Sequence, residues 1–464
     1  MTSGEGAPSV AAARLEALGR LAPHRPEAER FAALPAGFLA GGSAAGIKRS
    51  GKPDLAIVAT TGRPAAAAAV FTTNAFAAAP VRRSRANLAA SMPSGDGCYG
   101  LARAIVATSG SANAATGRAG DVDQEAICAA VGQALGSAPA EVLALSTGLI
   151  GTRLPVPVVV AGVAALVPRL TADAAGLEAA ARALMTTDSR PKWATIRLEL
   201  PDASGRGIPV TVSGIAKGVG MIHPRMATML AIVLTDAAAD PGTLRAILRR
   251  VAARTWDQLT VDGDTSTNDT VFLLASGAAG TAAPAAGSQE ETRLEAAVET
   301  VARDLARQQA ADGEGATTLI VCEVSGARDD AEARAVARSV VSSSLVKAAV
   351  HGRDPNWGRI ASATGIARLA DAAVLEAAGM DAATARDRAG SPVHCDPDRT
   401  RIAIAGTDVF AGVPLPFDPT VVSAAMDAPE VLVRVDLGLG DGSGEAFGCD
   451  LTEAYVVENS AYST

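Results

Sequence analysis

Short apolar runs and Ala-rich segments alternate along the first half of the chain. Asp54–Thr60 (DLAIVAT), Ala69–Thr73 and Ala104–Thr108 (AIVAT) have the length and composition of strands, and Gly-rich turns lie between them. Ala-rich segments such as Asp123–Gly136 suit helices. This pattern predicts mixed α and β structure with strands and helices interspersed.

The second half of the chain carries clearer periodicities. Ile196–Leu200 and Ile208–Val212 flank the turn PDASGRG and predict a hairpin. Pro241–Arg254 has a helical composition, and apolar residues at helical spacing predict an amphipathic helix over Glu291–Gln309. Val431–Leu437 alternates valine and leucine with Arg and Asp, which is typical of a half-buried strand.

The N-terminal segment, residues 1–30, is a charged, Ala-rich extension with one predicted helix over Ala13–Leu21. It carries Glu5 and has neither a basic start nor a long apolar run, so we do not expect a secretory signal. The most apolar run, Leu154–Val167, is short and contains two prolines, so it is not expected to span a membrane. We therefore expect a cytoplasmic protein.

Composition narrows the class of protein. The chain has 464 residues, enough for two or three cores. Aromatic residues make up only 3%, so the cores must be built mainly from Ala, Val, Leu and Ile. The net charge of −8, without a basic stripe, argues against nucleic-acid binding. Five scattered cysteines without a CxxC pair, and four dispersed histidines, indicate neither a disulfide framework nor a metal site.

The stretch Ile215–Ala237, IAKGVGMIHPRMATMLAIVLTDA, is the most informative for chemistry. Two glycines follow Lys217 and a proline comes soon after, so this part is predicted to be a loop. Thr228 then opens an apolar run that predicts a buried strand. A hydroxyl at such a junction is where a reactive peptide bond can be held.

Cleavage before Thr228 would give this residue a free α-amine beside its own hydroxyl. The reference pKa of an α-amine is about 7.7–8.0, so much of it is neutral near physiological pH and can take the hydroxyl proton. Residue types alone do not separate this hypothesis from an ordinary threonine at the start of a strand.

A resemblance to a known family favours the nucleophile hypothesis for Thr228 over the ordinary strand threonine. KGVGMIHPRMATML resembles the cleavage signature of the ornithine acetyltransferase (glutamate N-acetyltransferase) family of arginine biosynthesis, which implies cleavage between Ala227 and Thr228. The resemblance runs from about residue 31 to the C-terminus. Further stretches match in family order: GFLAGGSAAGIKRSGKPDLAIV, TTNAFAAAPV, TSGSANAATG, STGLIG, MTTDSRPK, VDGDTSTNDT, DGEGATTLI, GRDPNWGRI and GCDLTEAYVVENSAYST.

The resemblance implies an α/β fold, a layered sandwich of the ornithine acetyltransferase or DmpA-like type. That fold is similar to N-terminal-nucleophile hydrolases but differs in topology. It also implies an alpha chain, residues 31–227, and a beta chain, residues 228–464, that stay intertwined after cleavage as two copies of each. The implied reaction moves acetyl from N2-acetylornithine to glutamate, with no metal or organic cofactor and with acetyl-CoA as an open possibility for a second donor.

The implied site residues carry distinct roles. Thr228 would be the nucleophile, and Thr147 with the backbone N–H of Gly148 would form the oxyanion hole. Lys217 would contact the substrate and depress the pKa of the Thr228 amine, since a like charge disfavours a second one. The remaining substrate contacts would be Thr186, Glu314, Asn459 and Thr464, with Asn113 and Asn268 as polar residues of the site wall.

Four positions depart from the family pattern: Thr108, Thr318, His351 and Glu458. They leave open a paralogue that acts on another amino acid in a specialised pathway. Two other hypotheses remain: an amidohydrolase or aminopeptidase in which water resolves the acyl-enzyme, and an uncleaved binding protein. The intact Ala227–Thr228 and Thr147–Gly148 pairs count against the last of these.

Overall fold

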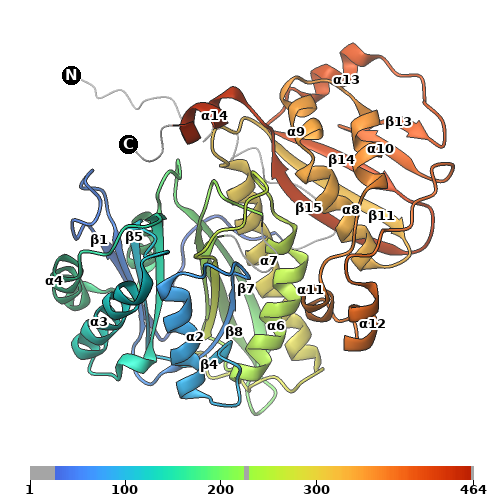
Figure 1. Cartoon of the computed structure of the whole chain (residues 1–464). Coiled ribbons are helices and arrows are strands. Elements are labelled where there is room, and N and C mark those ends of the chain that lie inside the picture. Colours follow the sequence, from blue (N-terminus) through green and yellow to red (C-terminus); the bar gives the residue numbers. More distant parts are fainter. Residues whose placement is uncertain (1–26, 224–228, 461–464) are drawn as a thin grey trace, which may run out of the picture.

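The computed structural model describes residues 27–223 and 229–460 (Figure 1). The helix predicted over Ala13–Leu21 lies outside the described residues. Three β-sheets form the framework, and helices cover their faces. The strands are β1 (Phe38–Ser43), β2 (Leu55–Thr60), β3 (Ala65–Phe71), β4 (Tyr99–Ala102), β5 (Ala104–Ser111), β6 (Val142–Leu149), β7 (Lys192–Pro201), β8 (Gly207–Lys217), β9 (Leu230–Thr235), β10 (Thr270–Ala275), β11 (Leu319–Ala327), β12 (Arg401–Ile404), β13 (Thr407–Ala411), β14 (Glu430–Asp436) and β15 (Gly442–Cys449).

The α-helices connect these strands and end the described chain. They are α2 (Ala79–Ser91), α3 (Gly117–Leu135), α4 (Val156–Leu166), α5 (Ala174–Leu184), α6 (Pro241–Arg254), α7 (Gln289–Ala311), α8 (Asp330–Ser342), α9 (Ser344–His351), α10 (Trp357–Gly365), α11 (Ala372–Ala377), α12 (Ala382–Arg388), α13 (Pro419–Met426) and α14 (Glu453–Ser460). Short 3-10 turns occur at Pro139–Glu141, Val167–Arg169 and Trp256–Gln258.

Two mixed sheets stack in the N-terminal part of the molecule. The first has the order β1-β2-β5-β6, with β5 and β6 parallel and the other neighbours antiparallel. The second has the order β4-β3-β10-β9-β8-β7, with only β10 and β9 parallel. One apolar layer joins their facing sides with α2 and α5. The outer side of the first sheet packs on α3 and α4, and that of the second on α6 and α7, giving a layered sandwich (Figure 1).

The third sheet has the order β13-β12-β14-β11-β15 and forms the C-terminal part of the molecule. One of its faces packs on α8, α9 and α10. At its other face, Val321 and Phe447 join the core that contains α7, so this helix connects the second and third sheets (Figure 1). The predicted α/β sandwich is therefore confirmed as an architecture.

Most predicted elements are confirmed, with changes at their ends. Helix α6 has the predicted bounds, and the predicted hairpin is the antiparallel pair β7–β8. The strand predicted from Ala69 begins at Ala65, and the helix predicted from Asp123 begins at Gly117, because alanine and glycine gave no clear boundary signal. The run after Thr228 forms β9, which is buried throughout and starts at Leu230.

The buried residues also match the composition. Alanine, valine, leucine and isoleucine make up most of the core, as predicted, and only a few aromatic side chains are buried. Strand β3, with the sequence AAAAAVF, is an example, because its alternate alanines enter the cores on both sides of the sheet. Within the described residues, no helix has the length and apolar character needed to cross a membrane.

Candidate active site

A cavity of about 310 Å³ lies where the ends of β6 and β8 meet the segments that follow α5 and α7. It brings together six of the predicted catalytic and substrate-contacting residues, which come from distant parts of the chain. These are Thr147, Gly148, Thr186, Lys217, Glu314 and Asn459. Ala227, Thr228 and Thr464 lie outside the described residues. Met229 and Leu230, the two residues after Thr228, also line the cavity.

Thr147 and Gly148 stand at the carboxyl end of β6, beside the parallel strand β5. Gly148 has φ = 127°, and a Cβ added there would lie 2.5 Å from the carbonyl carbon of Gly110. Only glycine fits this backbone at such a close approach. The turn is therefore fixed both by the left-handed conformation and by the contact with β5.

Lys217 is the last residue of β8 and pairs with Leu230, the first residue of β9. Its side chain is buried, and its Nζ donates a hydrogen bond to Thr147 Oγ1 at 3.2 Å. An ammonium group can only donate, so the threonine oxygen is the acceptor in this bond. The hydroxyl hydrogen of Thr147 is then available to a further acceptor in the cavity.

Other buried charged side chains, including Asp188 and Lys192, lie near Lys217. Burial lowers the pKa of Lys217, while the carboxylate of Asp188 acts in the opposite direction. Asp188 Oδ1 accepts the backbone N–H of Gly218 at 2.9 Å, directly after Lys217. Burial by itself raises the pKa of Asp188, but Lys192 and Lys217 bring it below its ordinary value. Asp188 is thus an anion that supports the cation at Lys217.

Lys192 completes this buried group. Its Nζ lies 2.7 Å from both Asp188 Oδ1 and Asp312 Oδ2, and its side chain is fully buried. Burial lowers the pKa of Lys192, but the two carboxylates together raise it above its ordinary value. Lys192 therefore links Asp188, in the segment after α5, to Asp312, the residue that follows α7.

Glu314 occupies another side of the cavity and has fixed partners. Thr187 Oγ1 donates to Glu314 Oε1 at 2.8 Å, and Asn459 Nδ2 donates to Glu314 Oε2 at 3.0 Å. A Cβ on Gly220 would come within 2.1 Å of Glu314 Oε2, so any larger residue there would displace this carboxylate. The carboxylate is held in place while it still borders the cavity.

The adjacent threonines have different environments. Thr186 was predicted as the substrate contact, and both Thr186 and Thr187 line the cavity. Thr187 is the one whose hydroxyl reaches Glu314, whereas the backbone N–H of Thr186 donates to Asp188 Oδ2 at 3.0 Å. The substrate role of Thr186 stays a prediction.

The two predicted wall asparagines also differ. Asn268 lines the cavity and donates to the carbonyl oxygens of Ala112 and Ser146, at 2.6 and 2.8 Å. It therefore holds the strand end that carries Thr147. Asn113 is buried with φ = 47°, and its Nδ2 donates to Gly120 O at 3.0 Å. That bond joins the turn after β5 to the start of α3.

Sequence analysis missed several supporting residues. Asp188, Lys192 and Asp312 were not singled out, although the first two belong to the matched stretch MTTDSRPK and the third opens the matched stretch DGEGATTLI. Gln309, whose Nε2 donates to Lys217 O at 2.8 Å, was absorbed into the amphipathic helix prediction. The only available signal was a close pair of opposite charges, which is usually a solvated surface feature.

The four departures from the family pattern lie in three places. Thr108 Oγ1 bonds to Ser146 Oγ at 2.9 Å, one residue before Thr147. His351 Nδ1 and the backbone N–H of Thr318 both contact Asp450, at 3.1 and 2.9 Å, below α14. Burial raises the pKa of Glu458, and nearby Glu314 adds to this effect. Among the four, Glu458 is therefore the one whose pKa is affected by the charge of a cavity residue.

Comparison with known proteins places these features in a family. The sequence model of the ArgJ family matches residues 39–464. The arginine biosynthesis bifunctional protein ArgJ of Thermus thermophilus is 44% identical over 434 residues, which are 93% of this chain and 99% of that protein. The protein of the same name from Thermosynechococcus vestitus is 43% identical, over 92% of this chain and 96% of that protein.

Two solved structures are also similar to this chain in sequence. The ArgJ crystal structure from Bacillus halodurans is 38% identical and covers 51% of this chain and 100% of that chain, with a TM-score of 0.44. The ornithine acetyltransferase of Mycobacterium tuberculosis, complexed with ornithine, is 41% identical and covers 43% and 99% of the two chains, with a TM-score of 0.38.

Proposed function

Because this chain belongs to the ArgJ family, we propose that it is a glutamate N-acetyltransferase of arginine biosynthesis. It transfers the acetyl group of N2-acetylornithine to glutamate and gives ornithine and N-acetylglutamate. One observation carries the proposal for the site: Lys217 Nζ bonds to Thr147 Oγ1 in a cavity that Met229, the residue after Thr228, also lines.

In this proposal the chain first cuts itself between Ala227 and Thr228. The new α-amine of Thr228 then serves as the base for the hydroxyl of the same residue. The pairing of Lys217 with Leu230 supports this assignment, because Thr228 is only two positions before Leu230. A cation near the new amine favours its neutral form, which is the form that accepts a proton.

The first half of the reaction forms an acetyl ester. Thr228 Oγ attacks the acetyl carbonyl of acetylornithine while its proton passes to the α-amine. The negative charge that develops on the carbonyl oxygen is stabilised by the hydroxyl of Thr147 and the N–H of Gly148. The C–N bond then breaks, and the amine of ornithine leaves with the proton.

Two charged residues suit the two ends of acetylornithine. Lys217 can pair with the α-carboxylate, and Glu314 can pair with the side-chain ammonium. Thr187 and Asn459 each donate to one oxygen of Glu314. These bonds hold the carboxylate in place, which supports its proposed role in binding an ammonium group. Thr186, Asn459 and Thr464 are proposed as further substrate contacts.

The second half of the reaction reverses the first with a different amine. The amine of glutamate attacks the ester carbonyl, the C–O bond to Thr228 breaks, and the threonine hydroxyl regains its proton. The hydroxyl and amine of Thr228 supply both nucleophile and base, so the proposed reaction needs no metal or organic cofactor. Acetyl-CoA is a chemically equivalent donor, since its thioester carbonyl can be attacked in the same way.

Assembly and location belong to the same proposal. Residues 31–227 and 228–464 stay together after cleavage as two alpha and two beta chains. The continuous β8–β9 pairing supports this, because it joins strands from the two sides of the cleaved bond. We place the enzyme in the cytoplasm, where the amino acids that it uses are made.

Separate half-reactions test the proposal. Acetylornithine alone should add one acetyl group to the fragment that starts at Thr228, and glutamate should then remove it, as intact-mass spectrometry would show. Double-reciprocal plots of the initial rate against one substrate, at several concentrations of the other, should give parallel lines. Intersecting lines would contradict the covalent route. Loss of acetylornithine at the same rate without glutamate would indicate a hydrolase instead.

A further inference from the structure

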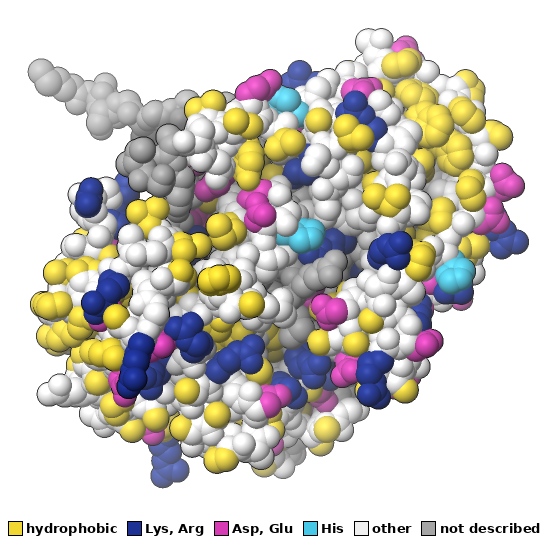
Figure 2. Space-filling view, viewed as in Figure 1, with side chains coloured by type: hydrophobic (Ala, Val, Ile, Leu, Met, Phe, Trp, Pro, Cys, Tyr) yellow, Lys and Arg dark blue, Asp and Glu magenta, His cyan; other side chains and the backbone are white. Residues whose placement is uncertain are grey.

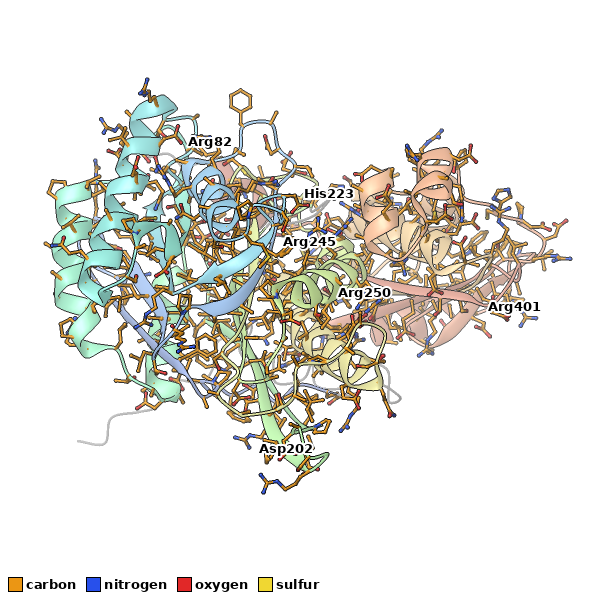
Figure 3. The ribbon with its side chains drawn as sticks, turned by 90° about the horizontal axis from the view of Figure 1, so that it is seen from below. Arg82, Asp202, His223, Arg245, Arg250 and Arg401 are labelled. Atoms are coloured by element: carbon orange, nitrogen blue, oxygen red, sulfur yellow. The ribbon has the colours of Figure 1, made fainter. Side chains whose placement is uncertain are left out.

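One loop contacts the chain on both sides of the proposed cleavage bond. This loop, residues 260–269, leads into β10 and includes most of the matched stretch VDGDTSTNDT. His223, the last described residue before the bond, lies where the N-terminal and C-terminal parts of the molecule meet (Figure 3). In the view of Figure 1, a histidine side chain reaches the surface between these two parts (Figure 2).

The segment before the bond is held to this loop by hydrogen bonds. The backbone N–H of Val261 donates to Ile222 O at 2.7 Å, and Thr265 Oγ1 donates to His223 O at 3.0 Å. The ring Nδ1 of His223 also lies 3.0 Å from Thr260 Oγ1. All three bonds join residues 222–223 to the loop, so the position of this segment depends on the loop.

Asp262 makes further bonds from the loop to this segment. Its Oδ2 accepts the backbone N–H of Met221 at 2.5 Å, and its Oδ1 accepts those of Ile222 and Asp264 at 2.8 and 3.2 Å. Tyr455 of α14 also forms a side-chain hydrogen bond with Asp262. A carboxylate offers about four acceptor positions, so these four donors occupy them. Asp262 therefore holds backbone in place, and its saturated oxygens argue against a role as a base.

The bond to Met221 supports an unusual backbone conformation. Met221 has φ = 53°, in the left-handed region that residues other than glycine rarely adopt. Burial raises the pKa of Asp262, whereas the three backbone donors act in the opposite direction. The carboxylate and the turn at Met221 thus stabilise each other, because each supplies the hydrogen-bond partner that the other needs.

The chain after the bond is anchored to the end of the same loop. Met229 O accepts the backbone N–H of Thr270, the first residue of β10, at 2.9 Å. Residues 224–228 therefore connect two residues, His223 and Met229, that are both held by the 260–270 stretch. Self-cleavage requires the attacking hydroxyl to approach the carbonyl carbon of the residue before it. Fixed flanks favour that approach, because they leave the connecting segment fewer conformations.

We propose that Asp262 is a positioning residue for the self-cleavage. This inference rests on the proposed function, to which it adds the group that holds the segment before the bond. In the cleavage, Thr228 Oγ attacks the carbonyl carbon of Ala227, the C–N bond breaks, and the hydroxyl proton passes to the amine nitrogen of Thr228. Water then hydrolyses the resulting ester, which releases the carboxyl group of Ala227 and the hydroxyl of Thr228. Asp262 exchanges no proton in these steps; it fixes Met221 and Ile222.

The test follows the full chain during cell-free synthesis and measures how fast it becomes two fragments. Asp262→Asn keeps the shape of the side chain, but an amide has only one acceptor oxygen, so the N–H of Met221 or of Ile222 loses its partner. Cleavage should slow by about tenfold to a hundredfold, the loss typical of a hydrogen bond to a charged group. Asp264→Asn is the matched control, because it makes the same change at an exposed position of the same loop. Its cleavage rate should equal that of the wild type.

Two further substitutions separate positioning from general destabilisation. Met221→Gly removes the conformational cost of φ = 53°, so it should recover part of the lost cleavage rate in the Asp262→Asn background. A general loss of stability would not be recovered in this way. Thr265→Val removes the bond to His223 O and leaves the carboxylate intact. It should slow cleavage by about twofold to tenfold, the loss typical of a neutral hydrogen bond.

Three results would overturn the inference. The first is cleavage of Asp262→Asn at the wild-type rate. The second is an equal slowing in Asp264→Asn, and the third is no recovery when Met221→Gly is added to Asp262→Asn. If Asp262→Asn does not fold, Thr265→Val carries the test, and wild-type cleavage in that variant would overturn the inference. Failure of the proposed function is a separate result: a wild-type protein that is not cleaved before Thr228.

Discussion

Asn459 of the C-terminal helix α14 donates its side-chain amide to Glu314 Oε2 at 3.0 Å. This bond connects the last described helix of the chain with the loop after α7, and both of its residues line the active-site cavity. The C-terminal segment is therefore part of the site wall, whereas the ordinary expectation for a chain terminus is fraying.

Removal of this bond should impair transfer without affecting cleavage. Asn459→Ala should lower kcat/KM for acetylornithine by about tenfold to a hundredfold, because a hydrogen bond to a charged group contributes about 1.5–3 kcal/mol. Deletion of residues 460–464 should have at least this effect, since Thr464 is proposed to contact substrate. Val457→Ala, at an exposed position of the same helix, is the control. Undiminished kcat/KM in the truncated enzyme would mean that the tail is dispensable.

The cleavage itself has a direct signature. The purified protein should consist of two fragments, residues 1–227 and 228–464, and N-terminal sequencing of the second should begin at Thr228. Thr228→Ala should remain one chain and lose transfer, because it lacks the hydroxyl that both reactions use. A second fragment that begins elsewhere, or an active uncleaved protein, would contradict the proposed nucleophile.

The pH dependence of kcat/KM should report the Thr228 amine. Activity should rise with pH as the amine loses its proton, with a midpoint at or below about 7.7–8.0 because Lys217 disfavours a second positive charge nearby. Lys217→Met removes that charge, so the midpoint should move upward and substrate binding should weaken. An unmoved midpoint would show that Lys217 does not act on the amine.

A second lysine provides a control for this profile. Burial lowers the pKa of Lys48 to about 8, in the same range as the amine, and its Nζ donates to Met185 O at 2.6 Å, just before Thr186. Lys48→Arg keeps the charge but does not titrate in this range. The rising limb should persist in this variant. Its disappearance would assign the limb to Lys48.

The buried ion pairs of Lys192 with Asp188 and Asp312 should contribute to the free energy of unfolding. Lys192→Met leaves Asp188 and Asp312 without their shared cation and should destabilise the protein by about 3–5 kcal/mol. Lys52→Met, at an exposed position, is the control. Thermal unfolding of both variants would measure the difference, and equal midpoints would contradict the assignment.

The same group predicts a direction for acid sensitivity. The pKa of Asp188 is lowered in the folded state, so its contribution to stability is present above the unfolded value of about 3.9 and is lost as the pH falls toward the folded value. Lys192→Met should therefore flatten the loss of stability below about pH 4 relative to the wild type. A steeper loss in the variant would contradict this sign.

Several features of this protein were predictable from the sequence because their signals are local. Helix α6 starts at a proline and has the predicted bounds, and the buried strand β9 is an uninterrupted apolar run. The matched motifs named Thr147, Gly148, Lys217 and Glu314 as site residues, and the structure brings all four to one cavity. Strand and helix ends in Ala-rich segments were less predictable, since alanine suits either element.

The sequence by itself determined the family, the residue types of the site and the α/β character, because each depends on motifs or on periodicity within a short window. Tertiary structure alone decided which polar groups meet. Thr187 rather than Thr186 reaches Glu314, and Lys192 lies between Asp188 and Asp312. Thr187 and Glu314, like Lys192 and Asp312, are more than a hundred residues apart in the chain, and local spacing carries no information about such non-local contacts.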